Sequence, residues 1–292
     1  MFASGPKALV AAIGVVVLAG CSAQSTDSTD VKVGAGDSAE SRLLAQIYAG
    51  AIRSAGTAVE VESGLGGRAD YLESLDRGDI TLIPDFTGAL LSEFDSTSRA
   101  TESEDVFVDL NRSLPEGLTV GDYALAEDRT AIAVSPAGPF ADASSLSDVE
   151  SDLYGRRMGV LGNPPKPDPQ EVVARLEPGI GDGFTDVVLY LDARTAVDAL
   201  ASGEIDVLAF TTVSFGPEAA DLVTLEDTES VFPAQNVVPL LRNGSLNDTA
   251  LATLSVVAGE LTTADLADMI GEVRSGGDSG DVAARWLGEH NL

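Results

Sequence analysis

RADYLESLDRGDITLIPDFTGALL, residues 68–91, contains the clearest signals of local structure in this chain. Its first part predicts a short helix with apolar side chains on one face. That helix is expected to end at Gly78, because glycine forms a left-handed helix cap at little cost. An apolar strand over residues 80–83 follows directly, and Pro84 is expected to end it. Residues 85–88 then open a second helix, so the stretch predicts a helix, a strand and a helix in close succession.

The loop after the predicted strand is a candidate binding site. Ligands of open α/β sheets bind beyond the carboxyl ends of the strands, where Phe86 offers an aromatic ring and Thr87 a hydroxyl. The alternative is an ordinary α/β turn with Phe86 packed inside the protein. The stretch alone supports the two interpretations equally.

The residues before this stretch follow the same alternation. Residues 31–33 predict a strand, and Asp37 and Glu40 have the spacing of a capping box for a helix with an apolar stripe that ends near Gly56. Residues 59–61 predict a second strand. The order of strands, loops and helices is typical of a parallel α/β sheet, in which three loops meet at one edge.

The pattern returns in the middle of the chain. A helix over residues 194–200 is capped by Gly203 and followed by a strand over residues 205–209. The segments LDRGDIT at residues 75–81 and LASGEID at residues 200–206 align with each other. Because a helix cap followed by a strand is common, this similarity is weak evidence of duplication, but it predicts a second α/β lobe.

Composition limits the classes of function. The chain has 292 residues, of which 44% are hydrophobic and 22% charged, enough for two domains with buried cores. Its formal net charge is −30, which argues against nucleic-acid binding and against adsorption to anionic lipids through a basic patch. We interpret the acidity as a source of solubility.

The N-terminus has the features of an export signal. Lys7 precedes an apolar run at residues 8–18, which is too short to span a bilayer and fits a signal peptide over residues 1–20. The sequence LAGC at residues 18–21 matches a bacterial lipobox, which predicts lipidation of Cys21. Residues 21–30 read as a flexible tether. The protein is therefore expected to be anchored at the outer face of the cytoplasmic membrane.

Residues for catalysis or metal binding are scarce. Cys21 is the only cysteine, which excludes disulfides and cysteine nucleophiles in the folded part. The only histidine, His290, stands at the end of the chain, so neither a Ser-His-Asp triad nor a histidine-based zinc site is expected. Acidic pairs such as Asp79 and Asp85 are interpreted as solvated charges. We expect a binding protein without cofactor or metal, and no enzyme.

A known family shares these segments in the same order. GDITLIPDFTGA at residues 78–89 resembles the motif Gly-[Asp/Glu]-Ile-Asp-x-x-Pro-[Glu/Asp]-Tyr-Thr-Gly-Thr of the substrate-binding lipoproteins of ABC importers for glycine betaine, choline and related osmoprotectants, the ProX-like or OpuAC-type family. Further matches run from residue 31 to the end of the chain. They are Val33-Gly34 leading to Glu40, Leu65-Gly66-Gly67, Leu200-x-x-Gly203-Glu204-Ile205-Asp206-Val207, Leu225-Glu226-Asp227 and Phe232-Pro233 leading to Asn236-x-x-Pro239.

The resemblance implies a type II periplasmic-binding-protein fold, an α/β architecture of two lobes with a ligand cleft between them. The two lobes are expected to be joined by two crossing segments, near residues 130–136 and 210–215. The first lobe would then comprise residues 31–129 and 214–292, and the second lobe residues 130–213. Closure of the lobes on the ligand would complete the site.

The resemblance also implies an aromatic cage for a quaternary ammonium, which is held by cation–π attraction. Phe86 stands at the tyrosine of the motif, and Phe210 at the aromatic residue of the second crossing. Thr130 and Gln235 stand where relatives have tyrosines, so two of the four cage positions are not aromatic. At roughly 0.5–2 kcal/mol for each contact, this loss would weaken betaine binding by about one to three orders of magnitude. Thr130 and Gln235 instead suit a ligand with hydroxyl or amide groups.

The remaining positions of the implied site are polar or small. The first loop has Ala35-Gly36 where relatives often have Ser-Lys. The other residues expected at the ligand are Asp37, Thr87, Thr211 and Asn236. The alternative for the cage itself is that Phe86 and Phe210 are core residues and that Gln235 faces solvent.

We therefore expect an extracytoplasmic, lipid-anchored, monomeric solute-binding protein that delivers glycine betaine, choline or a related solute to the permease and ATPase of an ABC importer. One alternative is the same fold with a more polar or polyhydroxylated ligand, and another is a sensory lipoprotein that is not coupled to transport. An exported hydrolase is a third hypothesis, which the missing nucleophile–histidine pair disfavours.

Overall fold

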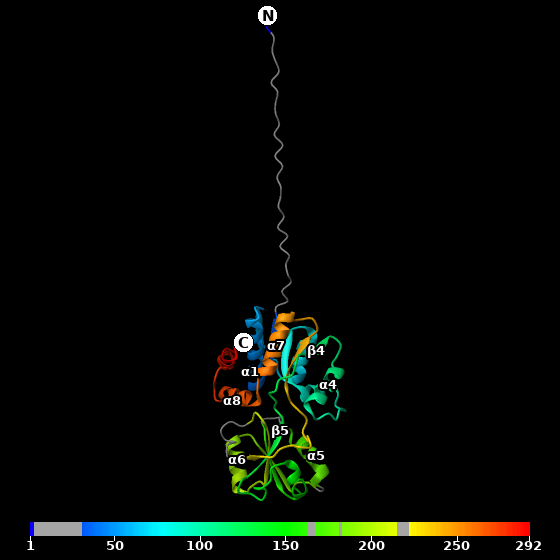
Figure 1. Cartoon of the computed structure of the whole chain (residues 1–292), viewed down its shortest axis with the longest axis vertical. Coiled ribbons are helices and arrows are strands. Elements are labelled where there is room, and N and C mark those ends of the chain that lie inside the picture. Colours follow the sequence, from blue (N-terminus) through cyan, green and yellow to red (C-terminus); the bar gives the residue numbers. More distant parts are fainter. Residues whose placement is uncertain (3–30, 163–166, 181–182, 215–221) are drawn as a thin grey trace.

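The computed structural model describes residues 1–2, 31–162, 167–180, 183–214 and 222–292. Residues 3–20 of the expected signal peptide, Cys21 and the whole of the expected tether lie outside the described residues. The folded part consists of two α/β lobes, one above the other in Figure 1, each built on one five-stranded sheet.

The first lobe begins with the predicted alternation of strands and helices and is completed by the C-terminal part of the chain. Its strand order is β2-β1-β3-β10-β4, with β1 parallel to β2 and β3 and with β10 antiparallel to both of its neighbours. Its elements are β1 (Val31–Ala35), α1 (Ala39–Ser54), β2 (Val59–Ser63), α2 (Arg68–Arg77), β3 (Leu82–Phe86), α3 (Thr87–Phe94), α4 (Ser103–Ser113), β4 (Leu118–Val120), β10 (Val237–Arg242), α7 (Asp248–Glu260), α8 (Thr263–Arg274) and α9 (Ser279–Glu289).

The second lobe has the same strand arrangement, in the order β7-β6-β8-β5-β9. Here β6 is parallel to β7 and β8, and β5 is antiparallel to β8 and β9. The fourth strand of each sheet, β10 in the first lobe and β5 in the second, is antiparallel to its neighbours. Both strands directly follow a segment that crosses between the lobes. The elements are β5 (Thr130–Val134), the 3-10 turns η1 (Leu146–Asp148) and η2 (Glu150–Asp152), β6 (Arg157–Leu161), α5 (Pro169–Ile180), β7 (Asp186–Tyr190), α6 (Ala193–Ser202), β8 (Val207–Thr211) and β9 (Val223–Thr224).

The predicted repeat is confirmed in its backbone geometry. Gly78 ends α2 with φ of 80°, and Gly203 ends α6 with φ of 73°, both in the left-handed region that favours glycine. In each case the next N–H reaches back to the last turn of the helix, from Asp79 to Ser74 O and from Glu204 to Ala199 O, both at 2.9 Å. The same turn therefore feeds the chain into the third strand of both sheets.

Both of these strands begin later than the sequence indicated. The strand expected over residues 80–83 is β3, which starts at Leu82 and continues through Pro84 to Phe86, so the prediction that Pro84 ends it is wrong. Pro84 lies opposite Pro239 of β10. Since Thr87 N–H donates to Asn236 O, the Pro84–Pro239 pair falls at a position of the ladder without hydrogen bonds, and neither ring removes a hydrogen bond between β3 and β10.

The second crossing also needs a correction. Val213 lies in the core of the first lobe, so the chain reaches that lobe near the expected position. However, β9 pairs with β5 in the second sheet, and Leu225 and Phe232 fill the second core. Residues 222–232 therefore belong to the second lobe rather than to the first, and the final return runs from Phe232 to β10.

Two local predictions change in detail. The cap of α1 is Ser38, whose side chain accepts from Ser41 N–H, rather than Asp37. The sequence of residues 145–153 also favours a capped helix, but the structure has a pair of 3-10 turns there, opened by a capping box of Ser145 and Asp148. Backbone and side-chain hydrogen bonds from Ser144 and Ser145 lower the pKa of Asp148 to about 2.

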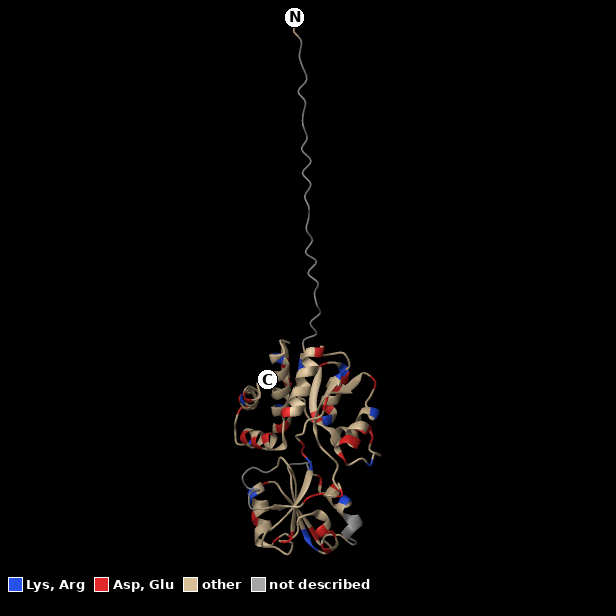
Figure 2. Ribbon diagram, in the orientation of Figure 1, with Lys and Arg blue, Asp and Glu red and all other residues tan. Residues whose placement is uncertain are grey.

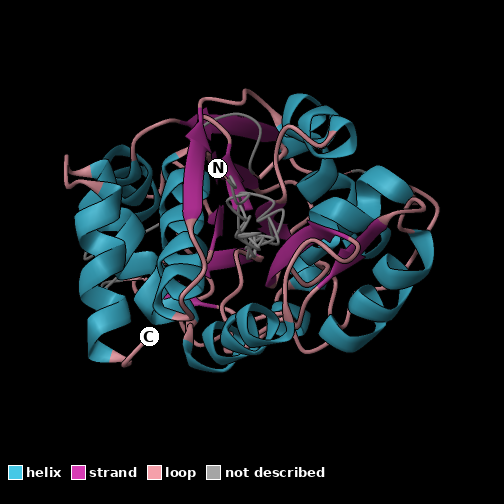
Figure 3. Cartoon of the chain, turned by 90° about the horizontal axis from the view of Figure 1, so that it is seen from above, coloured by secondary structure: helices cyan, strands magenta, loops and turns pink. Residues whose placement is uncertain are grey.

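Helices cover both faces of the sheets, as Figure 3 shows along the length of the molecule. In the first lobe, α1, α7, α8 and α9 share one core, and α2, α3 and α4 pack on the other face. In the second lobe, α5 and α6 lie on opposite sides of the sheet (Figure 1). Among the described helices none is alone long and apolar enough to cross a membrane, and only the pair α7 and α8, bent by 94°, passes that test together.

Candidate functional site

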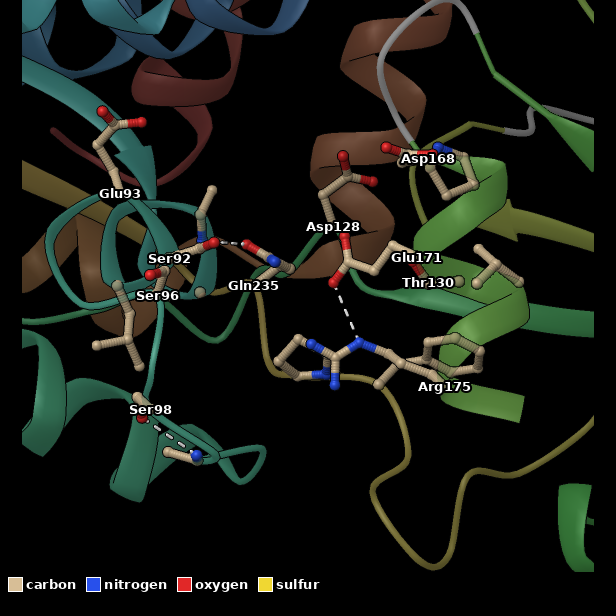
Figure 4. A pocket seen from close by; sticks show the side chains of 18 of the residues that line it. Ser92, Glu93, Ser96, Ser98, Asp128, Thr130, Asp168, Glu171, Arg175 and Gln235 are labelled. Atoms are coloured by element: carbon tan, nitrogen blue, oxygen red, sulfur yellow. Dashed lines mark hydrogen bonds and ion pairs between the residues drawn. The ribbon is translucent and has the colours of Figure 1, made fainter. Parts of the chain in front are cut away.

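A cavity of about 330 Å³ lies between the two lobes, at the carboxyl end of β3. The first lobe contributes α3 and the following loop, and the second lobe contributes the start of α5 (Figure 4). The segments that join the lobes form its floor with Asp128, Thr130, Thr211 and residues 232–235. This is the place where the carboxyl ends of strands are expected to hold a ligand.

Thr87 fastens the first turn of α3 to the crossing segment. It is fully buried, its N–H donates to Asn236 O at 2.9 Å, and its Oγ1 accepts from Asn236 N–H at 3.1 Å. A Cβ on the next residue, Gly88, would lie 2.5 Å from Ala234 O. The two backbones therefore touch at Gly88, and the expected ligand residue Thr87 is engaged in holding them together.

Three of the residues predicted from the sequence line the cavity together. Thr130 and Thr211 face each other in the register of β5 and β8. Gln235 approaches from the crossing segment, and its Oε1 accepts from Ala89 N–H at 3.0 Å, as the dashed line in Figure 4 shows. Gln235 thus satisfies an N–H at the start of α3 and still borders the cavity, so it does not simply face solvent.

The two predicted aromatic walls lie elsewhere. Phe86 is 4% exposed in the core of the first lobe, and Phe210 is 5% exposed in a core of the second lobe. Neither is among the described residues that line the cavity. Their burial favours the alternative that both are core residues. Of the described lining residues, Phe232 alone is aromatic, and it is 2% exposed.

The remaining predicted residues are not among the described lining of the cavity. Ala35 and Gly36 are buried at the end of β1, and the exposed Asp37 donates its N–H to Gly66 O at 3.3 Å. The first two loops therefore meet at one sheet edge, as the alternation of elements predicted. Asn236 is 5% exposed, and its Nδ2 donates to Ala124 O at 3.0 Å, which fixes the crossing segment.

Sequence reasoning missed a buried ion pair at the cavity wall. Arg68 lines the cavity, and its Nε and Nη2 donate to Asp85 Oδ2 and Oδ1 at 2.9 and 2.8 Å. The Tyr71 hydroxyl donates to Asp85 Oδ2 at 2.5 Å. Asp85 was expected to be solvated, but it is 4% exposed. In the sequence, Tyr71 counts toward the apolar face of the predicted helix, and the signal that points to the pair is the arginine at the start of that helix.

The buried cluster of Arg68, Tyr71 and Asp85 shifts the pKa values of Tyr71 and Arg68. Burial and the negative charge of Asp85 raise the pKa of Tyr71, so its hydroxyl remains a hydrogen-bond donor at neutral pH. Burial acts to lower the pKa of Arg68, but the hydrogen bonds and the charge of Asp85 raise it above its ordinary value. The guanidinium therefore stays charged and fixed in orientation.

Among the described lining residues of the cavity, acidic side chains outnumber basic ones. Figure 2 shows acidic residues distributed over both lobes. Asp128 is 4% exposed; its Oδ1 accepts from Val213 N–H at 3.3 Å, and its Oδ2 has no hydrogen-bond partner in the described structure. Arg175 is paired with Glu171 at 3.1 Å (Figure 4). The acidic lining residues are Glu93, Asp95, Asp128, Asp168 and Glu171, and the basic ones are Arg68, Arg99 and Arg175. This excess of carboxylates favours a ligand with a cationic group.

Comparison with known proteins agrees with this architecture. The family model for the substrate-binding domain of ABC-type glycine betaine transport systems, OpuAC, matches residues 29–289. No curated protein sequence matches the chain. The match over most of the chain confirms the resemblance seen in the sequence.

Solved structures show the same fold at low sequence identity. A glycine betaine/carnitine/choline ABC transporter structure has a TM-score of 0.74 at 18% identity and covers 90% of this chain and 99% of its own. Apo YehZ from Escherichia coli has a TM-score of 0.69 at 20% identity, covering 89% and 98%. Lactococcal OpuAC, closed on glycine betaine, has a TM-score of 0.56 at 12% identity, covering 90% and 96%. The two-lobed type II periplasmic-binding-protein fold is thereby confirmed.

Proposed function

The chain belongs to the OpuAC family of substrate-binding domains of ABC-type glycine betaine transport systems, and from that premise we propose that it binds glycine betaine, choline or a related small solute and delivers it to an ABC importer. The family match over residues 29–289 is the observation that carries this proposal. The cavity between the lobes supports it, because a ligand there would contact both lobes and favour their closure. Closure would give the permease and its ATPase a ligand-dependent surface to recognise.

The proposed location is the outer face of the cytoplasmic membrane, where a lipid on Cys21 would hold the folded part by a short tether. This proposal rests on the sequence LAGC after an apolar run. Membrane fractionation of cells that express the full chain tests it. The unmodified chain should be found in the membrane fraction. Labelling with a radioactive lipid precursor should mark the unmodified chain and not the variant Cys21→Ser. Equal lipid labelling of the two proteins would contradict the proposal.

A second candidate is the same binding role with a more polar or polyhydroxylated ligand. The observation that favours it is the scarcity of aromatic rings around the cavity, where Phe232 is the only one among the described lining residues. Thr130, Thr211 and Gln235 offer hydroxyl and amide groups in the same place. A cleft of this kind holds a neutral polar ligand through hydrogen bonds rather than through cation–π contacts.

Calorimetric titration of the full chain with glycine betaine, choline, carnitine and a panel of polyols distinguishes the two candidates. Binding of a quaternary ammonium compound is the expected result. Binding of polyols alone would replace the first candidate by the second. Absence of heat from every compatible solute would contradict the assignment of an osmoprotectant ligand.

A further inference from the structure

We propose that Arg68 is the anchor for a carboxylate on the ligand, so that the cleft selects carboxylate-bearing solutes over alcohols such as choline. The inference rests on the proposed function, because it concerns the ligand of the same cavity. Arg68 is the first residue of α2, its side chain is 25% exposed, and it borders the cavity, whereas its partner Asp85 is 4% exposed behind it.

The guanidinium is held in one orientation before any ligand arrives. Asp85 occupies Nε and Nη2, and within the described structure Nη1 has no hydrogen-bond partner. Because Asp85 takes only Nε–H and one N–H of Nη2, both N–H groups of Nη1 and the second N–H of Nη2 remain for a ligand. A donor that is already fixed loses little conformational freedom on binding, and an arginine N–H bond to a carboxylate is among the stronger hydrogen bonds in proteins.

Asp85 does not depend on Arg68 alone for its hydrogen bonds. Its Oδ2 also accepts from the Tyr71 hydroxyl, and its Oδ1 accepts from Phe86 N–H at 2.8 Å. The carboxylate is thus stabilised by three groups, so the guanidinium is not its sole partner. The acidic side chains of the cavity wall attract a cation and repel a carboxylate, so an arginine is the favoured place for the carboxylate of a zwitterion. Of the three lining arginines, Arg175 is paired with Glu171 and Arg99 is exposed, whereas Arg68 is held in place by Asp85.

The second lobe shows that the fold does not require this ion pair. The repeated helix–strand unit places Ala193, Ala196 and Phe210 at the positions of Arg68, Tyr71 and Asp85, 125 residues later. These three side chains pack in one apolar cluster. Since buried ion pairs are often no more stabilising than well-packed apolar groups, stability does not account for the pair in the first lobe. The position of the ion pair on the cavity wall accounts for its presence.

Glycine betaine and choline provide a matched test, because both carry a trimethylammonium group and only the former carries a carboxylate. We expect the full chain to bind glycine betaine more tightly than choline in calorimetric titration. Arg68→Gln should weaken glycine betaine binding by about 10- to 100-fold and choline binding by less than about threefold. The control Arg77→Gln, on the exposed end of the same helix and away from the cavity, should change neither affinity.

A second variant protects the test against loss of folding. Arg68→Gln leaves Asp85 buried without its cation, whereas Arg68→Gln with Asp85→Asn removes both charges and should melt close to the unmodified chain while losing the preference for glycine betaine. Equal losses for the two ligands, or tighter binding of choline by the unmodified chain, would overturn the role of Arg68 and leave the proposed function standing. Binding of neither ligand would overturn the proposed ligand class and this assignment with it.

Discussion

The helix–strand units at residues 68–86 and 193–211 share their backbone and differ in their buried side chains. Both end a helix with a left-handed glycine, and both then place a nearly fully buried isoleucine, Ile80 or Ile205, before the third strand of a sheet. After these residues the first unit buries Asp85 with its arginine and tyrosine, and the second buries Phe210 in an apolar cluster that includes Ala193 and Ala196.

The difference separates what builds a lobe from what builds a site. The glycine cap, the isoleucine and the strand are present in both units, so they belong to the architecture. The polar cluster is present only in the unit whose arginine borders the cavity. A buried ion pair that the architecture does without, on the wall of a cleft, is expected where a ligand has to be oriented.

The largest expected effect comes from placing the acid of the first lobe at the matching position of the second. Phe210→Asp removes a buried ring and leaves a carboxylate in an apolar cluster without the arginine and tyrosine of the first unit, because Ala193 and Ala196 stand at those two positions. We expect it to lower the free energy of unfolding by more than about 5 kcal/mol, which is most of the stability of an ordinary domain. Urea unfolding followed by circular dichroism measures it.

Phe210→Leu is the matched control for the apolar role of this position. It keeps a hydrophobic side chain, so the loss should be below about 2 kcal/mol. If the aspartate variant were no less stable than the leucine variant, the second lobe would be able to hold a buried acid, and the contrast between the two units would disappear.

A smaller effect is expected where the first unit continues into α3. Gly88 touches the crossing segment: a Cβ there would lie 2.5 Å from Ala234 O and 2.8 Å from Gln235 Nε2. Val213 stands at the corresponding position of the second unit, where the chain has left its strand. Gly88→Ala should therefore lower the free energy of unfolding by about 1–3 kcal/mol, since backbone atoms have to move. It should also weaken ligand binding, because Gln235 lines the cavity.

Gly271→Ala is the control for this substitution. Gly271 lies inside α8 with nothing within 4 Å of its Cβ position, so alanine should stabilise the chain by up to about 1 kcal/mol through its helix propensity. A neutral Gly88→Ala variant in thermal and urea unfolding would mean that the crossing segment is free to move away from α3.

Local signals predicted the architecture well because the repeated unit is encoded locally. The glycine caps, the apolar strands and the helical stripes all lie within a few residues of each other, and the two lobes follow from them. The ends of β3 and β8 were misplaced because pairing across the sheet decides them. Pro84 is tolerated in the strand because it stands at a position of the β3–β10 ladder without hydrogen bonds. The membership of β9 in the second sheet likewise depends on a partner 90 residues earlier in the sequence.

The site was less predictable for the same reason. Thr130, Thr211 and Gln235 were found from their places beside strands and crossings, and the structure brings them together. The pairing of Arg68 with Asp85 joins the start of a helix to the end of a strand, a contact that no short pattern records. An aromatic residue at the end of a strand is compatible with a ligand cage and with a hydrophobic core. Phe86 packs in the core of the first lobe, a contact that the local sequence does not predict.

The smallest expected effect tests whether the two units really share their turn. Gly78 and Gly203 both have left-handed φ angles, of 80° and 73°. An added Cβ would meet only Arg242 at 3.5 Å, an ordinary contact, in the first case and nothing within 4 Å in the second. Backbone strain is then the only penalty, so Gly78→Ala and Gly203→Ala should each lower the free energy of unfolding by about 1 kcal/mol.

Asparagine tolerates this conformation better than alanine, so Gly78→Asn and Gly203→Asn should lose less stability. Urea unfolding of the four variants would contradict a shared turn if the two alanine variants differed by more than about 1 kcal/mol, since the same strain would then not act at both positions.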